Sequence, residues 1–129
     1  MHASPPRRPT DAELAILRVL WDRGPSTVRQ VHEALAEGRD TGYTTTLKLM
    51  QIMAEKSLVT RDETSRTHVY AARASQERTQ GQLLDDLLER AFGGSAAALV
   101  QRALSTHRAS EDELKEIGRL IEAYRKERR

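Results

Sequence analysis

Inward-facing positions in the first 57 residues recur three or four residues apart, which is the spacing of helices that bury one face. Turn-forming residues divide this stretch into three runs. The positions expected to face inward are Leu14, Leu17, Leu20 and Trp21 in the first run, Val28, Val31, His32 and Leu35 in the second, and Thr46, Leu49, Met50 and Met53 in the third. The pattern predicts three short helices that share one core.

Capping residues mark where these helices begin and end. The first run opens with a capping box, Thr10-Asp-Ala-Glu13, in which each terminal side chain is expected to bond to the backbone amide of the other residue. Gly24-Pro25 closes that helix, and Ser26 is expected to cap a second helix that runs to about Ala36. Residues 37–42 form the turn before the third helix.

Two short segments after the third helix alternate apolar and polar residues, as strands do. They are residues 58–63 and 67–71, and they flank the turn-forming residues 64–66. Three helices followed by a hairpin is the order of a winged helix-turn-helix. The fold class is therefore expected to be mainly α with a small β-hairpin wing.

The third helix has a second face that suits nucleic acid. Thr44, Thr45, Lys48 and Gln51 lie opposite the buried positions, and they supply hydrogen-bonding groups and one cation without an acidic residue. Such a surface is typical of a helix that lies in a DNA groove and contacts base edges. We therefore expect this helix to be the recognition helix.

The predicted hairpin carries basic residues that could contact the DNA backbone. Arg61, Arg66 and His68 can project towards phosphates, where arginine forms charge-assisted hydrogen bonds that position a protein without reading sequence. The alternative is that they are ordinary exposed strand residues.

The sequence from Ser75 onward is almost continuously helix-forming. Its apolar stripes cannot all be buried against a small winged domain, so a second copy of the chain is the simplest partner. The residues expected to form this homodimer interface are Leu83, Leu84, Leu87, Leu88, Leu99, Val100, Leu114, Ile117, Ile121 and Tyr124. The last helix is expected to open with a second capping box, Ser110-Glu-Asp-Glu113. The competing interpretation is that this tail folds back on its own domain.

Three parts of the chain follow from these patterns. Residues 1–9 contain three prolines and are expected to form a flexible N-terminal arm, residues 10–74 a winged-helix DNA-binding domain, and residues 75–129 a three-helix dimerisation tail. A twofold dimer would place two recognition helices on the half-sites of a palindrome.

Composition narrows the possible functions. The net charge is +2, and it lies in residues 1–74, which hold 11 Arg/Lys against 9 Asp/Glu, while residues 75–129 hold 10 of each. The chain has no cysteine, and its four histidines share no metal-ligand spacing, so neither a metal nor another cofactor is expected. No apolar run approaches the roughly 20 residues of a spanning helix, and the N-terminus lacks a secretion signal. We therefore expect a cytoplasmic protein without a membrane partner.

Several segments taken together resemble the penicillinase repressor family (BlaI/MecI/CopY type). They are residues 10–21, residues 26–31, Tyr43-Thr-Thr45 with Leu49, Met50 and Met53, Tyr70 after the wing, and Phe92-Gly-Gly94 and residues 110–114 in the tail. The resemblance covers residues 10 to about 125. It implies a dimeric bacterial repressor that occupies a pseudo-palindromic operator overlapping a promoter.

The resemblance also implies roles for single residues. Thr44, Thr45 and Lys48 would contact the groove, Thr27 would contact a phosphate at the start of the second helix, and Arg66 would act from the wing.

The chain departs from the family pattern at four places. Family members commonly carry a basic residue where this chain has Ile52, and often a glycine where it has Ser57, so the operator sequence does not carry over. The Asn-Phe bond that is cleaved in the antibiotic-resistance branch aligns with Gln101-Arg102, and the cysteine metal motif of the copper branch is absent. The releasing signal therefore stays open, and an unidentified sensor or protease is a possible partner.

Two other classes of function compete with a repressor. A winged-helix adaptor could bind another protein through Leu47 and Ile52, which are expected to be exposed, although these side chains could equally touch thymine methyl groups. An enzyme finds little support, because the carboxylate pairs such as Asp85-Asp86 are expected on helix surfaces and no phosphate loop or nucleophile elbow occurs.

Overall fold

The computed structural model describes residues 8–36 and 42–128. They form two compact units, which divide between Leu83 and Leu84 within one helix, and each unit is described by itself. The predicted turn at residues 37–42 lies outside the described residues except for Gly42, and the predicted arm does so except for Arg8 and Pro9.

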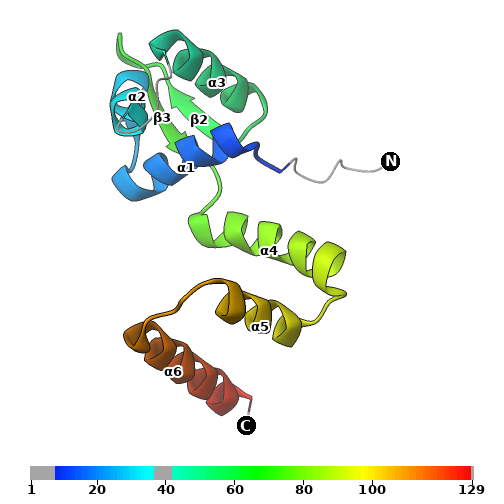
Figure 1. Cartoon of the computed structure of the whole chain (residues 1–129). Helices are drawn as coiled ribbons and strands as arrows, with labels where there is room; N and C mark the ends of the chain where they lie inside the picture. Colours follow the sequence, from blue (N-terminus) through cyan, green and yellow to red (C-terminus); the bar gives the residue numbers. More distant parts are fainter. Residues whose placement is uncertain (1–7, 37–41, 129) are drawn as a thin grey trace. The chain divides into compact units, whose positions relative to one another are not determined.

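The first unit packs three helices around a small antiparallel sheet (Figure 1). The sheet order is β1-β3-β2, with Ser26 opposite Tyr70 and Val59 opposite Ala72. The elements are α1 (Asp11–Arg23), β1 (Ser26–Thr27), α2 (Val28–Ala36), α3 (Tyr43–Glu55), β2 (Val59–Asp62) and β3 (Val69–Ala72). The predicted winged helix-turn-helix is therefore confirmed, and a third strand joins its hairpin.

The core of the first unit lies between the inner faces of the helices and the sheet. Its buried apolar residues are Ile16, Leu17, Leu20, Val28, Val31, Met50, Met53, Val59 and Tyr70. The inward stripe predicted for α1 is confirmed at Leu17 and Leu20, whereas Leu14 and Trp21 are only half-buried. Glu13 and Ile16, which were not predicted to face inward, are buried. Trp21 packs against the core edge, and its Nε1 donates a hydrogen bond to the carbonyl of Ala74 at 3.0 Å.

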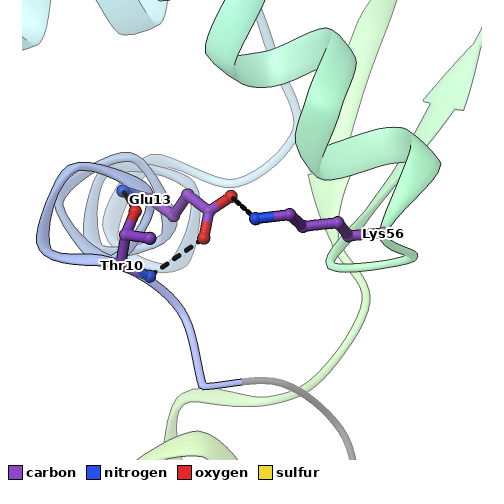
Figure 2. A network of polar contacts seen from close by, with 3 residues as sticks. All are labelled: Thr10, Glu13 and Lys56. Atoms are coloured by element: carbon purple, nitrogen blue, oxygen red, sulfur yellow. Dashed lines mark hydrogen bonds and ion pairs between the residues drawn. The ribbon is translucent and has the colours of Figure 1, made fainter.

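The capping box that begins α1 is also part of a partly buried ion pair. Thr10 and Glu13 exchange the two predicted side-chain to backbone bonds. Figure 2 shows the Glu13 carboxylate between the Thr10 amide and the ammonium group of Lys56, which lies 2.9 Å from Oε2. Burial acts to raise the pKa of Glu13, but the Thr10 hydrogen bonds and Lys56 outweigh it and hold that pKa below its usual value.

The predicted cap of the second helix is wrong. Ser26 belongs to β1, is buried opposite Tyr70, and its hydroxyl donates to the Gly24 carbonyl. Thr27 caps α2 instead, because its Oγ1 accepts from the Gln30 amide and the Gln30 side chain accepts from the Thr27 amide. The strand pairing draws Ser26 inward and moves the cap one residue along the chain.

The α3 helix ends in a Schellman turn. The Leu58 amide bonds to the Met53 carbonyl and the Ser57 amide bonds to the Ala54 carbonyl. Ser57 takes the left-handed position of this turn with a φ of 63°, and it is the one non-glycine residue with positive φ in the described part of the chain.

Helix α4 (Gln76–Phe92) leads from the first unit into the second, which also contains α5 (Ala96–Thr106) and α6 (Glu111–Glu127). Gly93 and Gly94, both with positive φ, follow the end of α4 and precede α5. The Ser110 hydroxyl accepts from the Glu113 amide at the start of α6, which confirms that half of the predicted capping box. Neither α5 nor α6 contains a fully buried residue.

Among residues 8–36 and 42–128, no helix has both the length and the apolar character that crossing a bilayer requires.

Candidate nucleic-acid interface

The two faces of α3 differ as the sequence predicted. Thr46, Met50 and Met53 are buried at 1% exposure or less, and Leu49 is half-buried. The opposite face is exposed, and it carries Thr44, Thr45, Lys48 and Gln51. The core contacts fix the rotation of the helix, so these polar groups have to point outward.

The beginning of α3 favours negatively charged partners. The N-cap is Gly42, whose carbonyl accepts from the Thr45 and Thr46 amides, and no side chain caps the helix. The first turn contains no acidic residue. Backbone amides at a helix N-terminus carry the positive end of the helix dipole and bind phosphate oxygens.

A hollow of about 460 Å³ lies between the start of α2, the exposed side of α3 and the wing. Its lining residues are Thr27, Val28, Arg29, Tyr43, Leu47, Gln51, Arg66, Thr67, His68 and Tyr70. They include two arginines and no carboxylate. The structure thus brings together four of the predicted DNA-contacting residues, namely Thr27, Gln51, Arg66 and His68, while Thr44, Thr45 and Lys48 lie exposed on α3 outside this lining.

Side-chain hydrogen bonds order the wing. Asp62 accepts from both the amide and the hydroxyl of Thr64, and these bonds hold its pKa below the usual value. Ser65 donates to the carbonyl of Thr67. The exposed Arg66 therefore sits in a turn that is held on both sides.

Arg61 is more constrained than the sequence suggested. It lies opposite Tyr70 across the sheet, and its guanidinium contacts the Glu63 carboxylate at 2.7 Å. A hydrogen bond with the Tyr70 side chain, followed by the Glu63 charge, raises the pKa of Arg61. A phosphate would have to compete with these two partners for the guanidinium.

Two residues of the hollow, Arg29 and Tyr43, were missed by sequence reasoning. The Arg29 guanidinium lies over the Tyr43 ring, 5.2 Å from its centroid. This contact joins α2 to the first residue of α3, and helical spacing within either segment gives no sign of it. The one signal in the sequence was the place of Tyr43 at the start of the predicted recognition helix.

The expected exposure of Leu47 and Ile52 is wrong. Both are half-buried, and Leu47 packs against the core. The apolar surface on which the adaptor interpretation rested is therefore smaller than the sequence suggested.

Comparison with known proteins agrees with this geometry. A model of the penicillinase repressor family matches residues 9–123. The chain is also 43% identical over 93 residues to the transcriptional regulator BlaI of Mycobacterium tuberculosis, from strains CDC 1551 / Oshkosh and ATCC 25618 / H37Rv, and this similarity spans 70% of this chain and 67% of the relative. The chain belongs to the penicillinase repressor family. It is a transcriptional repressor and not an enzyme, and the family resemblance drawn from the sequence is confirmed.

Proposed function

We propose that this repressor binds a pseudo-palindromic operator as a homodimer, with one α3 helix in each major-groove half-site. The observation that carries the proposal is the exposed face of α3, which presents Thr44, Thr45, Lys48 and Gln51 without an acidic residue. Threonine, glutamine and lysine can hydrogen-bond to base edges, and each good contact contributes about 1–3 kcal/mol of discrimination.

Backbone contacts complete the proposed complex. Thr27 at the start of α2 and Arg66 and His68 in the wing line the hollow beside α3. Contacts of this kind to phosphates fix the register of α3 on the duplex without reading sequence. Arg61 would add a further contact after exchanging its Glu63 partner for a phosphate.

The tail formed by α4, α5 and α6 supplies the proposed dimer interface. Large apolar residues are exposed on all three of its helices, including Leu84, Leu87, Val100, Leu114 and Ile121, each 41–49% exposed. The other members of the proposed interface are Leu83, Leu88, Leu99, Ile117 and Tyr124. Exposed apolar stripes of this size favour association with a self-complementary surface. A bound dimer would repress by occupying the promoter.

Release by an unidentified sensor or protease is the remaining part of the proposal. Gln101 and Arg102 are exposed but lie inside α5. Cleavage between them would require the helix to unwind first.

Lys48→Ala tests the placement of α3 in the groove. We expect it to weaken binding to the operator duplex by about tenfold or more, because the substitution removes a base contact from each half-site, while the dimer stays intact. Gel-shift titration measures the affinity and sedimentation measures the dimer. The operator duplex is the genomic segment recovered with the protein by immunoprecipitation from its own cells. Unchanged affinity of the variant would refute this placement of α3.

A further inference from the structure

The position of Tyr43 at the first turn of α3 is set by two residues of α2. The His32 ring meets the Tyr43 ring edge-on, with centroids 5.8 Å apart and planes at 85°. The Arg29 guanidinium carbon lies over the same ring, 5.2 Å from the Tyr43 centroid. The tyrosine therefore contacts both an imidazole and a guanidinium, although 39% of its own surface stays exposed.

His32 is itself held in place from α3. Its Nδ1 lies 3.2 Å from the Oγ1 of Thr46, and Thr46 is buried. The contacts run from the core outward, from Thr46 to His32, then to Tyr43, and finally to Arg29. The order of burial follows the same path, since His32 is half-buried and Arg29 is exposed. A series of contacts that begins in the core fixes the orientation of its outermost group.

Arg29 is accessible to an anion. Within the part of the chain that the structure describes, no carboxylate pairs with it, and the hollow that it lines with Thr27, Arg66 and His68 contains no acidic residue. A guanidinium that stacks on an aromatic face keeps its in-plane N–H groups free, and these match two phosphate oxygens. Holding it there in advance reduces the conformational entropy that binding costs.

We infer that Arg29, held over the ring of Tyr43, contacts a backbone phosphate of the DNA in each half-site, and that Tyr43 is its positioning residue. The inference rests on the proposed function and adds to it a contact outside the expected set of residues. A phosphate contact should matter equally on every sequence, whereas a base contact should matter on the operator alone.

The test compares two duplexes of equal length, the operator segment and a scrambled version, over a range of salt concentrations. We expect Arg29→Ala to weaken binding to both duplexes by the same factor, roughly tenfold. The plot of log affinity against log salt should become less steep by about 0.9 for each phosphate that is no longer neutralised, or roughly 1.8 for a bound dimer. Arg18→Ala removes the same charge from an exposed position on α1 outside the hollow, and it should leave the slope unchanged.

The role of Tyr43 is tested by two substitutions and their combination with Arg29→Ala. Tyr43→Phe keeps the ring and should bind as the wild type does, whereas Tyr43→Ala should weaken binding to both duplexes severalfold. Because Tyr43 acts through Arg29, the double variant should bind no more weakly than Arg29→Ala alone. Thermal unfolding of each variant distinguishes weakened DNA binding from impaired folding.

The outcomes separate this inference from the proposed function. If Arg29→Ala binds DNA with the affinity and salt slope of the wild type while Lys48→Ala still weakens operator binding, only the phosphate contact of Arg29 is overturned. Additive effects in the double variant would overturn the positioning role of Tyr43. If the wild type does not prefer the operator and Lys48→Ala binds normally, the proposed function fails, and this inference fails with it.

Discussion

Ser57 adopts a backbone conformation that suits glycine better than serine. Its φ of 63° is needed for the two hydrogen bonds that end α3 and turn the chain into β2. A side chain in the left-handed region costs about 1 kcal/mol because Cβ crowds the backbone. A glycine, which the family resemblance implies at this position, would adopt this φ without strain.

We therefore predict that Ser57→Gly stabilises the protein by up to about 0.5 kcal/mol, since the relief of strain slightly exceeds the cost of the added freedom of the unfolded chain. Urea denaturation measures the change, and Ser57→Ala is the matched control because it keeps Cβ. A Ser57→Gly protein less stable than Ser57→Ala by about 0.5–1 kcal/mol would show that the conformation is not strained, because only the entropy cost of glycine would then remain.

Glu13 makes stability depend on pH. Hydrogen bonds from Thr10 and the charge of Lys56 keep its pKa in the folded protein below the ordinary 4.5. The unfolded chain therefore takes up this proton at a higher pH than the folded protein does. The stabilisation is fully present above the ordinary pKa and is lost as the pH falls through the lowered one.

The pH prediction is measured by urea denaturation between neutral and acid pH. Wild-type stability should fall below pH 4.5, and Glu13→Gln should remove this part of the decrease because it cannot titrate. Glu116→Gln is a control that removes an exposed carboxylate of α6. The stability of this variant should depend on pH as that of the wild type does. If the stability of Glu13→Gln falls at acid pH as much as that of the wild type, this carboxylate is not the source of the decrease.

At the scale of elements, the sequence predicted every helix of the described residues and missed one strand. The helices carry long periodic stripes, and the two strands of the wing alternate over several residues. The third strand, Ser26–Thr27, is too short to show alternation, and only its pairing with β3 reveals it. The same pairing explains why Thr27 rather than Ser26 caps α2.

Thr27→Ala tests this cap. It removes the hydroxyl that accepts from the Gln30 amide, and we expect a decrease of about 1 kcal/mol in unfolding free energy. Thr27→Ser keeps the acceptor and should stay close to the wild type in thermal denaturation. Ser26→Ala should act differently, because Ser26 bonds to the Gly24 carbonyl and caps nothing.

Across the whole molecule, the polar face of α3 could be predicted from sequence but the hollow beside it could not. Helical periodicity alone assigns Thr44, Thr45, Lys48 and Gln51 to one side of α3. The hollow needs three separate elements to meet, and its Arg29–Tyr43 contact joins residues 14 positions apart in different helices. The burial of Glu13 could not be predicted from the sequence either, because its partner Lys56 comes from the far end of α3.

Ile121→Asp tests the tail as a dimer interface. Ile121 is 48% exposed on α6, next to Val100 and Leu104 in an apolar hollow of about 680 Å³. A buried carboxylate without a partner disfavours association, so the variant should sediment as a monomer and bind the operator more weakly by tenfold or more. Glu122→Gln alters the neighbouring position without adding charge, and it should remain dimeric. If the Ile121→Asp protein remains dimeric, Ile121 does not belong to the dimer interface.

The indole of Trp21 gives the molecule an optical probe of its own. It is the single tryptophan in the sequence, and its N–H is bonded to the Ala74 carbonyl two residues before α4 begins. Its emission therefore depends on whether the segment that enters α4 remains attached to α1. Fluorescence from unlabelled protein can then follow that junction while the operator, or any agent that dislodges the repressor, is titrated in.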